Sequence, residues 1–324
     1  MIKKIILLIT FSSLCNIISA QQSAITLDFG LPGRFGNRIT VYYKAKLISY
    51  TYSIPLLYRE GGKLFNLMSL HKAEKRLDQC DIKQFKNIVR LTKKEKPSLI
   101  KANNATLYIV DFNTNLASLG IKPAAGRDET FLKEFRQMVQ PSDSLQEVFR
   151  PKDKITVAVH VRKGGGYDRP LFMEKVQIDP FLIPTSDYHD VIFPKRFPPD
   201  QFYIDQIKYI SKMFHNKPLY IHIFTDSKTP KDIVEKYKTA VGLPNVTFAC
   251  RETENFYDKN VLEDLLSMAN FDCLIRPESY YSMMAEKIGN HMIIISPKSF
   301  VWKNRNMSIN KVHIIKRIDE KQPK

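Results

Sequence analysis

The feature that most constrains the fold is an unbroken β-branched run, Ile155-Thr-Val-Ala-Val-His-Val161, followed at once by Arg162-Lys-Gly-Gly-Gly-Tyr-Asp168. A run without polar alternation is typical of a strand buried on both faces, as in parallel sheets covered by helices. Beyond it, helical patterns alternate with short apolar runs over 219–224, 246–250, 272–275 and 291–296. This alternation predicts a doubly wound α/β domain over roughly residues 152–317. The helices are expected at 200–214, 230–240, 259–269 and 280–289.

The first half of the chain opens in the same way. A strand-like run over 25–29 leads into the loop Gly30-Leu-Pro-Gly-Arg-Phe-Gly-Asn37, and apolar positions recur at helical spacing up to Tyr52. Strands are also expected over 54–58 and 107–112, and a helix over 128–150. With 324 residues the chain has room for two domains. We therefore predict an N-terminal α/β lobe over 21–151, a second lobe over 152–317 and a tail over 318–324.

Between those elements lies a basic stretch, residues 59–101, with 12 Lys and Arg against 5 acidic residues. It indicates helices with solvated faces or a basic rim. The whole chain carries a formal charge of +17, which favours an anionic partner such as a nucleic acid, a phosphorylated or acidic small molecule, or a membrane surface. We keep peripheral contact with an acidic membrane surface as one use of this charge.

The first twenty residues have the pattern of a secretory signal peptide. Lys3 and Lys4 precede an apolar run from Ile5 to Leu14, and Ser19-Ala20 supplies small residues for cleavage. A retained signal anchor is the alternative, although the run is short for a full membrane span. The sequence thus predicts export to a periplasm, a secretory lumen or the extracellular space. Export makes nucleic acid a poor partner, and no zinc, helix-turn-helix or RNP-type motif is present.

Four cysteines are present, of which Cys15 lies in the signal segment. Cys80, Cys250 and Cys273 have no C-x-x-C spacing, so a metal site is not expected. One disulfide remains open, and buried thiols are the favoured interpretation because Cys250 and Cys273 sit near apolar runs.

Polar groups follow three strands of the second lobe, where ligands of parallel sheets bind. After the first strand, Arg162 and the glycines from Gly164 onward would let a guanidinium and backbone N–H groups approach a diphosphate; a plain turn is the alternative. After the second, Thr225 and Asp226 would bind a nucleoside or cap the next helix. After the third, Ser279 and Ser282 begin a helix, which favours an anion site or an ordinary N-cap. Residues 169–200, with six prolines, are expected to form a loop over the site.

Taken together, these segments resemble the fucosyltransferase superfamily, which includes the α-1,2-, α-1,6- and protein O-fucosyltransferases. Gly33-Arg-Phe-Gly-Asn37 resembles the G-R-F-G-N loop of the protein O-fucosyltransferases, and the segment from His160 to Asp168 resembles the H-x-R motif of the α-1,6 enzymes. Ile223-Phe-Thr-Asp226 and the stretch from Leu266 to Ala285 are similar to two further motifs. The resemblance implies a GT-B-like fold, with two Rossmann-like lobes facing across a cleft and the acceptor on the N-terminal side.

The same resemblance implies an inverting, metal-independent transfer from a GDP-fucose donor to a glycan or glycoprotein acceptor, with no other cofactor. Arg162 is then the catalytic residue that neutralises the β-phosphate, and Asp168 and His160 are the candidates for the acceptor base. The donor would be held by backbone and side-chain groups on both lobes, namely Gly33, Arg34, Gly36, Asn37, Gly164, Thr225, Asp226, Ser279 and Ser282.

Three alternatives remain from the sequence. Lys163 stands where these families carry a second Arg, and Tyr280 to Met283 replace an aromatic Ser-Trp-Trp pattern, so another nucleotide sugar is a rival donor. A secreted carbohydrate-binding relative without activity would keep the fold but lose donor binding. The presence of Arg162 beside a glycine loop argues against this alternative. A phosphohydrolase would need paired acids or a metal cluster, which the sequence does not display.

Overall fold

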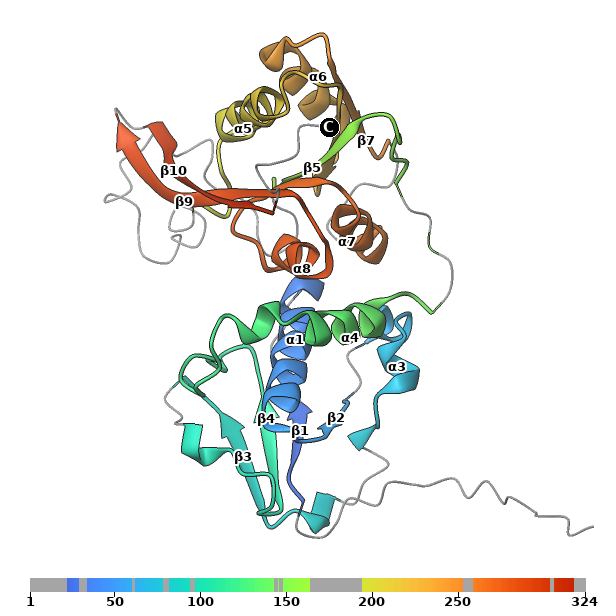
Figure 1. Ribbon diagram of the computed structural model, residues 1–324, viewed down its shortest axis with the longest axis vertical. Helices are drawn as coiled ribbons and strands as arrows, with labels where there is room; N and C mark the ends of the chain where they lie inside the picture. Colours follow the sequence, from blue (N-terminus) through green and yellow to red (C-terminus); the bar gives the residue numbers. More distant parts are fainter. Residues whose placement is uncertain are drawn as a thin grey trace, which may run out of the picture.

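The computed structural model is built of two α/β lobes, the architecture predicted from the sequence (Figure 1). Each lobe has its own largely parallel sheet, and helices lie between the two sheets. The structure describes residues 22–28, 34–59, 62–77, 82–93, 97–142, 145, 148–163, 194–252, 259–303 and 306–317.

The first lobe contains a four-stranded, fully parallel sheet of order β2-β1-β4-β3. Its strands are β1 (Ala24–Leu27), β2 (Leu56–Leu57), β3 (Asn87–Leu91) and β4 (Thr106–Val110). Helix α1 (Phe35–Tyr52) packs against the sheet, and helix α4 (Glu129–Val139) packs against α1. The start of α4 is fixed by Asp128, whose carboxylate accepts a hydrogen bond from the Phe131 N–H. The shorter elements are α2 (Lys63–Asn66), α3 (Leu70–Ala73), η2 (Ile82–Gln84), η3 (Pro97–Leu99) and η4 (Ala125–Arg127).

The second lobe contains a six-stranded sheet of order β10-β9-β8-β5-β6-β7. Five strands are parallel, and β10 pairs antiparallel with β9 in a long hairpin that extends beyond the sheet in Figure 1. From β5 the chain continues to β6 on one side, and from β8 it continues to β9 on the other. The strand order therefore reverses between β5 and β8, which is where open α/β sheets bind their ligands. The elements are β5 (Ile155–Val161), α5 (Asp200–Met213), β6 (Leu219–Thr225), α6 (Pro230–Val241), β7 (Val246–Cys250), α7 (Val261–Ala269), β8 (Cys273–Ile275), α8 (Tyr280–Ile288), β9 (Ile293–Lys303) and β10 (Asn306–Lys316).

The lobes meet where the start of α1 contacts α8 (Figure 1). A Cβ atom on Gly36 would lie 2.8 Å from the backbone nitrogen of Tyr281, so the two helices approach backbone to backbone. One apolar cluster runs from Ile25 through α1 and α4 to Leu265 on α7 and Met284 on α8. Arg136 on α4 also donates through Nε to the Ile288 carbonyl, 2.7 Å away. The core thus continues across the lobe boundary and fixes the start of α1 against α8.

Three expectations from the sequence need correction. The helix expected over 128–150 ends at Val139, because Pro141 disfavours helical geometry in Gln140, whose ψ is 146°. The basic stretch 59–101 contains the edge strand β3, and not only helices. The second lobe is not purely parallel as expected. The segment from 306 forms β10, an antiparallel edge strand beside β9.

Several other predictions lie outside the described residues. These are the signal segment 1–20, residues 169–193 of the expected loop, and Cys80. Within the part of the chain that is described, Cys250 and Cys273 are free thiols, and Cys273 is buried. No helix among the described residues combines the length and the apolar character that crossing a bilayer requires.

Candidate active site

The candidate site lies at the carboxyl edge of the second sheet, where the strand order reverses. Arg162 follows β5 directly, and Ser279, the N-cap residue of α8, lies four residues after Ile275 at the end of β8. Because β5 and β8 are hydrogen-bonded neighbours, these two features share one edge. A guanidinium beside a helix N-terminus is an arrangement suited to a diphosphate.

The Arg162 side chain packs over an aromatic ring. Its Cζ atom lies 5.0 Å from the centre of the Phe197 ring, a cation–π contact that restricts where the guanidinium points. Phe197 belongs to the segment that leads into α5, so the far end of the Pro-rich stretch supports the predicted catalytic residue.

Asp226 holds the turn after β5 in place. Its Oδ1 accepts a hydrogen bond of 2.7 Å from the backbone N–H of Lys163. Its Oδ2 lies 3.8 Å from Nη1 of Arg34, which comes from the first lobe. Asp226 therefore joins the end of β5, the end of β6 and the start of α1. The structure brings Arg34, Asp226 and Arg162 to one region, as the sequence predicted, and adds that Asp226 organises the other two segments.

The Lys163 side chain is held by a second carboxylate, Asp200, at the first position of α5. Nζ of Lys163 lies 2.7 Å from Asp200 Oδ1, Nζ of Lys236 lies 2.6 Å from Oδ2, and the Tyr237 hydroxyl donates to Oδ1 over 2.8 Å. Burial raises the Asp200 pKa, but the hydrogen bonds from the two lysines outweigh it and lower the pKa to about 2. The residue after Arg162 is therefore fixed through both its backbone and its side chain.

The N-terminus of α8 is not capped in the usual way. Ser279 occupies the N-cap position, yet its side chain makes no capping hydrogen bond. The buried Ser282 hydroxyl lies 3.5 Å from the Ser279 carbonyl oxygen. An ordinary N-cap, the alternative that the sequence left open, is therefore not what Ser279 forms, and the helix N-terminus keeps the partial positive charge that attracts anions.

Thr225 does not cap a helix either. Helix α6 has Thr229 at its N-cap position, and Thr225 Oγ1 instead accepts a hydrogen bond of 3.2 Å from the Ser227 N–H in the intervening turn. Helix capping is thus excluded for Thr225 and Asp226. Contact with a nucleoside stays a prediction for both.

His160 is buried at the end of β5 and packs edge-on against the Tyr281 ring, with 5.6 Å between ring centres. Burial and the nearby positive charges of Arg162 and Arg276 lower its pKa to about 3. Its Nδ1 atom is buried and has no hydrogen-bond partner in the described structure. The sequence made His160 a candidate acceptor base, with a buried residue that orients its neighbours as the alternative. Its low pKa and enclosed position favour that alternative over base catalysis.

Of the remaining predicted residues, the structure describes Gly36 and Asn37. Gly36 faces the Tyr281 backbone, which gives this glycine a packing role. Asn37 lies in the first turn of α1 and donates its backbone N–H to the Arg34 carbonyl over 2.9 Å. Gly33, Gly164 and Asp168 lie outside the described residues.

Sequence reasoning missed three residues of this site. Asp200 and Phe197 lie more than thirty positions from their partners Lys163 and Arg162, so no local pattern links them. Arg276 follows β8 and binds the buried Glu286 of α8 through Nε, 2.8 Å from Oε2. An Arg at a strand end with a Glu ten residues later was the available signal. No group of three metal-binding side chains is found among the described residues.

Comparisons with known proteins give the following. No family model matches the sequence, and no curated protein matches it. The fold is similar to that of POFUT1 in complex with GDP-fucose, with 12% identity over 84% of this chain and 95% of the other and a TM-score of 0.45. It is also similar to a mutant of Arabidopsis thaliana FUT1 in complex with GDP, with 12% identity over 84% of this chain and 70% of the other and a TM-score of 0.49. Both are fucosyltransferases, the superfamily that the sequence motifs resemble.

Proposed function

We propose that this protein is a glycosyltransferase that moves a sugar, most simply fucose, from a GDP-linked donor to a glycan or glycoprotein. One observation carries the proposal: a guanidinium after β5 and the uncapped N-terminus of α8 after β8 share the edge where the strand order reverses. Both are groups for an anionic ligand, and that edge is where nucleotides bind in such sheets. The choice of GDP-fucose as the donor rests on the motifs from Gly33 to Asn37 and from His160 to Asp168.

The reaction we propose is a single displacement with inversion at the anomeric carbon and without a metal ion. A hydroxyl group of the acceptor attacks the anomeric carbon as the bond from that carbon to the β-phosphate oxygen breaks. The hydroxyl proton passes to a base, for which Asp168 is a candidate from the sequence, and negative charge develops on the β-phosphate of the departing GDP. Arg162 would neutralise that charge, aided by the N-terminal dipole of α8. Phe197, Asp226 and Asp200 would keep the 162–163 turn ready before the donor arrives, so little reorganisation is needed during the reaction.

Arg34 is the contribution of the first lobe to the same site. Its ion pair with Asp226 places it at the carboxyl edge of the second sheet. There it would add a second positive charge beside the donor. Both lobes are then required for donor binding.

Calorimetric titration of the purified protein with GDP, GDP-fucose, UDP-sugars and ADP-sugars tests the proposal. We expect binding of the GDP compounds and transfer of fucose when an acceptor mixture is added. Binding of UDP- or ADP-sugars alone would replace the donor assignment. Binding of none of them would refute the proposed function.

A further inference from the structure

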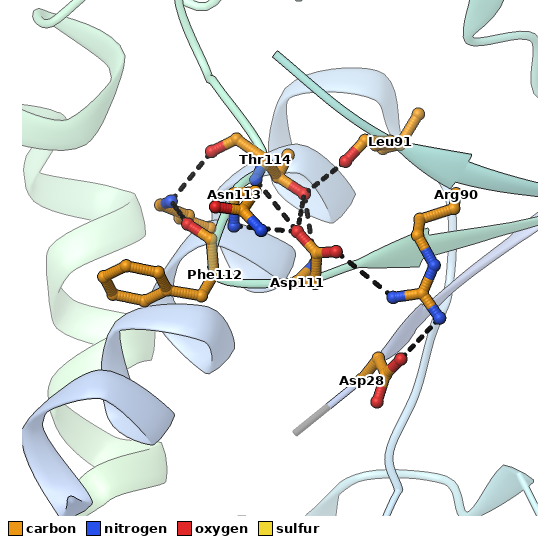
Figure 2. Close-up of polar contacts among 8 residues, drawn as sticks. Asp28, Arg90, Leu91, Asp111, Phe112, Asn113 and Thr114 are labelled. Carbon is orange, nitrogen blue, oxygen red and sulfur yellow. Dashed lines mark hydrogen bonds and ion pairs between the residues drawn. The ribbon is translucent and has the colours of Figure 1, made fainter. Parts of the chain in front are cut away.

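A second group of charged side chains lies at the carboxyl edge of the first sheet (Figure 2). Asp28 follows β1, Asp111 follows β4, and Arg90 is in β3. Arg90 lies between the two carboxylates: Nη1 is 3.1 Å from Asp111 Oδ2, and Nη2 is 2.5 Å from Asp28 Oδ2. We call these three side chains the Arg90 cluster. None of them was singled out from the sequence.

The Arg90 cluster is rigid because the turn after β4 is fixed on several sides. Asp111 Oδ1 accepts hydrogen bonds from the N–H groups of Asn113 and Thr114, and the Thr114 hydroxyl donates to the Leu91 carbonyl over 2.8 Å. From α1, Nζ of Lys44 donates to the carbonyls of Phe112 and Thr114 over 2.8 and 2.7 Å. The carboxylate that orients Arg90 is therefore itself held in one position.

The Arg90 side chain of this arrangement is nevertheless open to solvent. The Arg90 side chain is 48% exposed although it carries two ion pairs, and Asp28 and Asp111 are 22% and 14% exposed. Ion pairs with that exposure contribute little to stability. A fixed guanidinium flanked by carboxylate oxygens has both donors and acceptors to offer, which is what the hydroxyl groups of a sugar require.

The Arg90 cluster also lies beside the lobe boundary. Phe112, the residue after Asp111, points away from Arg90 in Figure 2, and its ring meets the Tyr280 ring edge to face at 5.1 Å between centres. Tyr280 is the first residue of α8, directly after Ser279 of the candidate donor site, and is 40% exposed. A chain of sugar units over Arg90 would lead along these rings towards α8.

We infer that the Arg90 cluster binds the acceptor, and that the acceptor is a neutral glycan recognised through its hydroxyl groups. This inference rests on the proposed function. With the Lys44 ammonium group on the same turn, two positive charges balance the two carboxylates, so the cluster has no net charge to attract a sulfated, phosphorylated or sialylated chain. The large positive charge of the protein therefore serves the donor and other surfaces, and not the acceptor.

An array carrying neutral oligosaccharides, acidic oligosaccharides and peptides, probed in the presence of GDP, tests the inference. The wild-type protein is expected to bind neutral oligosaccharides. Arg90→Ala should weaken that binding about tenfold or more, because hydrogen bonds to a charged group are lost. Arg90→Lys, which keeps the charge and loses the planar fork, should fall in between. Lys238→Gln, which removes the exposed charge that faces Glu235, is the matched control and should bind like the wild type.

Calorimetry with GDP separates this inference from the proposed function. Unchanged GDP affinity in Arg90→Ala, together with lost glycan binding, supports the inference. Equal glycan binding by Arg90→Ala and the wild type would overturn it, and so would wild-type binding of acidic glycans only, of peptides only, or of nothing on the array. Arg90-dependent glycan binding without any GDP binding would sink the proposed function and leave the glycan site standing.

Discussion

The carboxyl edges of the two sheets carry different chemistry on similar scaffolds. In the second lobe, the edge between β5 and β8 presents Arg162 and a helix N-terminus, both suited to an anion. In the first lobe, the edge beside β1 and β4 presents Arg90 enclosed by Asp28 and Asp111. Parallel strands deliver their following residues to one edge in both cases. What differs is how the arginine is held: Arg90 lies between two carboxylates, whereas Arg162 packs over the Phe197 ring on the same edge as a helix N-terminus. We assign the first edge to hydroxyl groups and the second to phosphate.

Removing Arg162, the arginine of the second lobe, is the strongest test of the phosphate site in this comparison. Arg162→Ala should lower kcat for transfer by about 10²–10³-fold, as expected for the loss of one group that stabilises transition-state charge. Arg162→Lys should keep part of the activity, because a point charge replaces a planar fork. Steady-state kinetics with the folded variants provide the measurement. Wild-type activity in Arg162→Ala would remove Arg162 from the site.

Gly36→Ala tests whether the lobes must meet closely for the donor site to exist. The added Cβ would lie 2.8 Å from the Tyr281 backbone nitrogen, so α1 and α8 would have to separate. We expect a loss of about 1–3 kcal/mol in unfolding free energy, the usual cost of overpacking. GDP affinity should fall at the same time, because Arg34 begins the same helix. Chemical denaturation and calorimetry give both numbers; unchanged values would mean that the helices move apart freely.

Asp200→Asn tests the support of the 162–163 turn through its pH dependence. The folded-state pKa of about 2 is below the ordinary value of 3.8, so Asp200 stabilises the fold above about pH 4. That contribution is lost as the pH falls from about 4 to 2. The shift corresponds to about 2 kcal/mol at pH 7. Urea unfolding at pH 7 and pH 3 should show Asp200→Asn less stable than the wild type at pH 7, with a deficit about half as large at pH 3. An equal deficit at both pH values would contradict the charge-based explanation.

His160 should produce the smallest kinetic effect. With a pKa lowered to about 3, it is neutral throughout the range from pH 5 to 8. The pH profile of kcat/KM should therefore lack a step near 6.5 due to His160, and His160→Gln should have the same profile shape. A wild-type step near 6.5 that vanishes in His160→Gln would identify His160 as the base after all. Because the unfolded chain protonates His160 near pH 6.5, its contribution to stability declines as the pH falls from about 6.5 towards 3.

The second lobe was the easier half to predict from sequence. Its strands are continuous apolar runs because helices cover both faces. From α5 onward its helices alternate with the strands without long interruptions. Two edge strands, β3 and β10, were missed. β3 is a short run inside the basic stretch and is exposed at three of its five positions, and β10 lies beyond the last parallel strand. The helix predicted after Asp128 was too long because the effect of Pro141 on the conformation of Gln140 was left out.

The site followed the same division. Residues at strand ends, such as Arg162 and Asp226, could be found because parallel topology brings them together. Asp200 and Phe197 could not, since their partners lie in other segments and only the tertiary structure brings them into contact. The Arg90 cluster could not be predicted from the sequence. Its one Arg and two Asp are spread over more than eighty residues and form no motif.

The central claim is that Arg162 acts on the β-phosphate of the donor, and comparison of GDP with GMP tests it most directly. Calorimetric titrations of the wild type and Arg162→Ala with both nucleotides give two affinity ratios. We predict that the wild type binds GDP about tenfold or more tightly than GMP, and that the ratio falls to about one in Arg162→Ala. A GDP preference of equal size in both proteins would contradict the account.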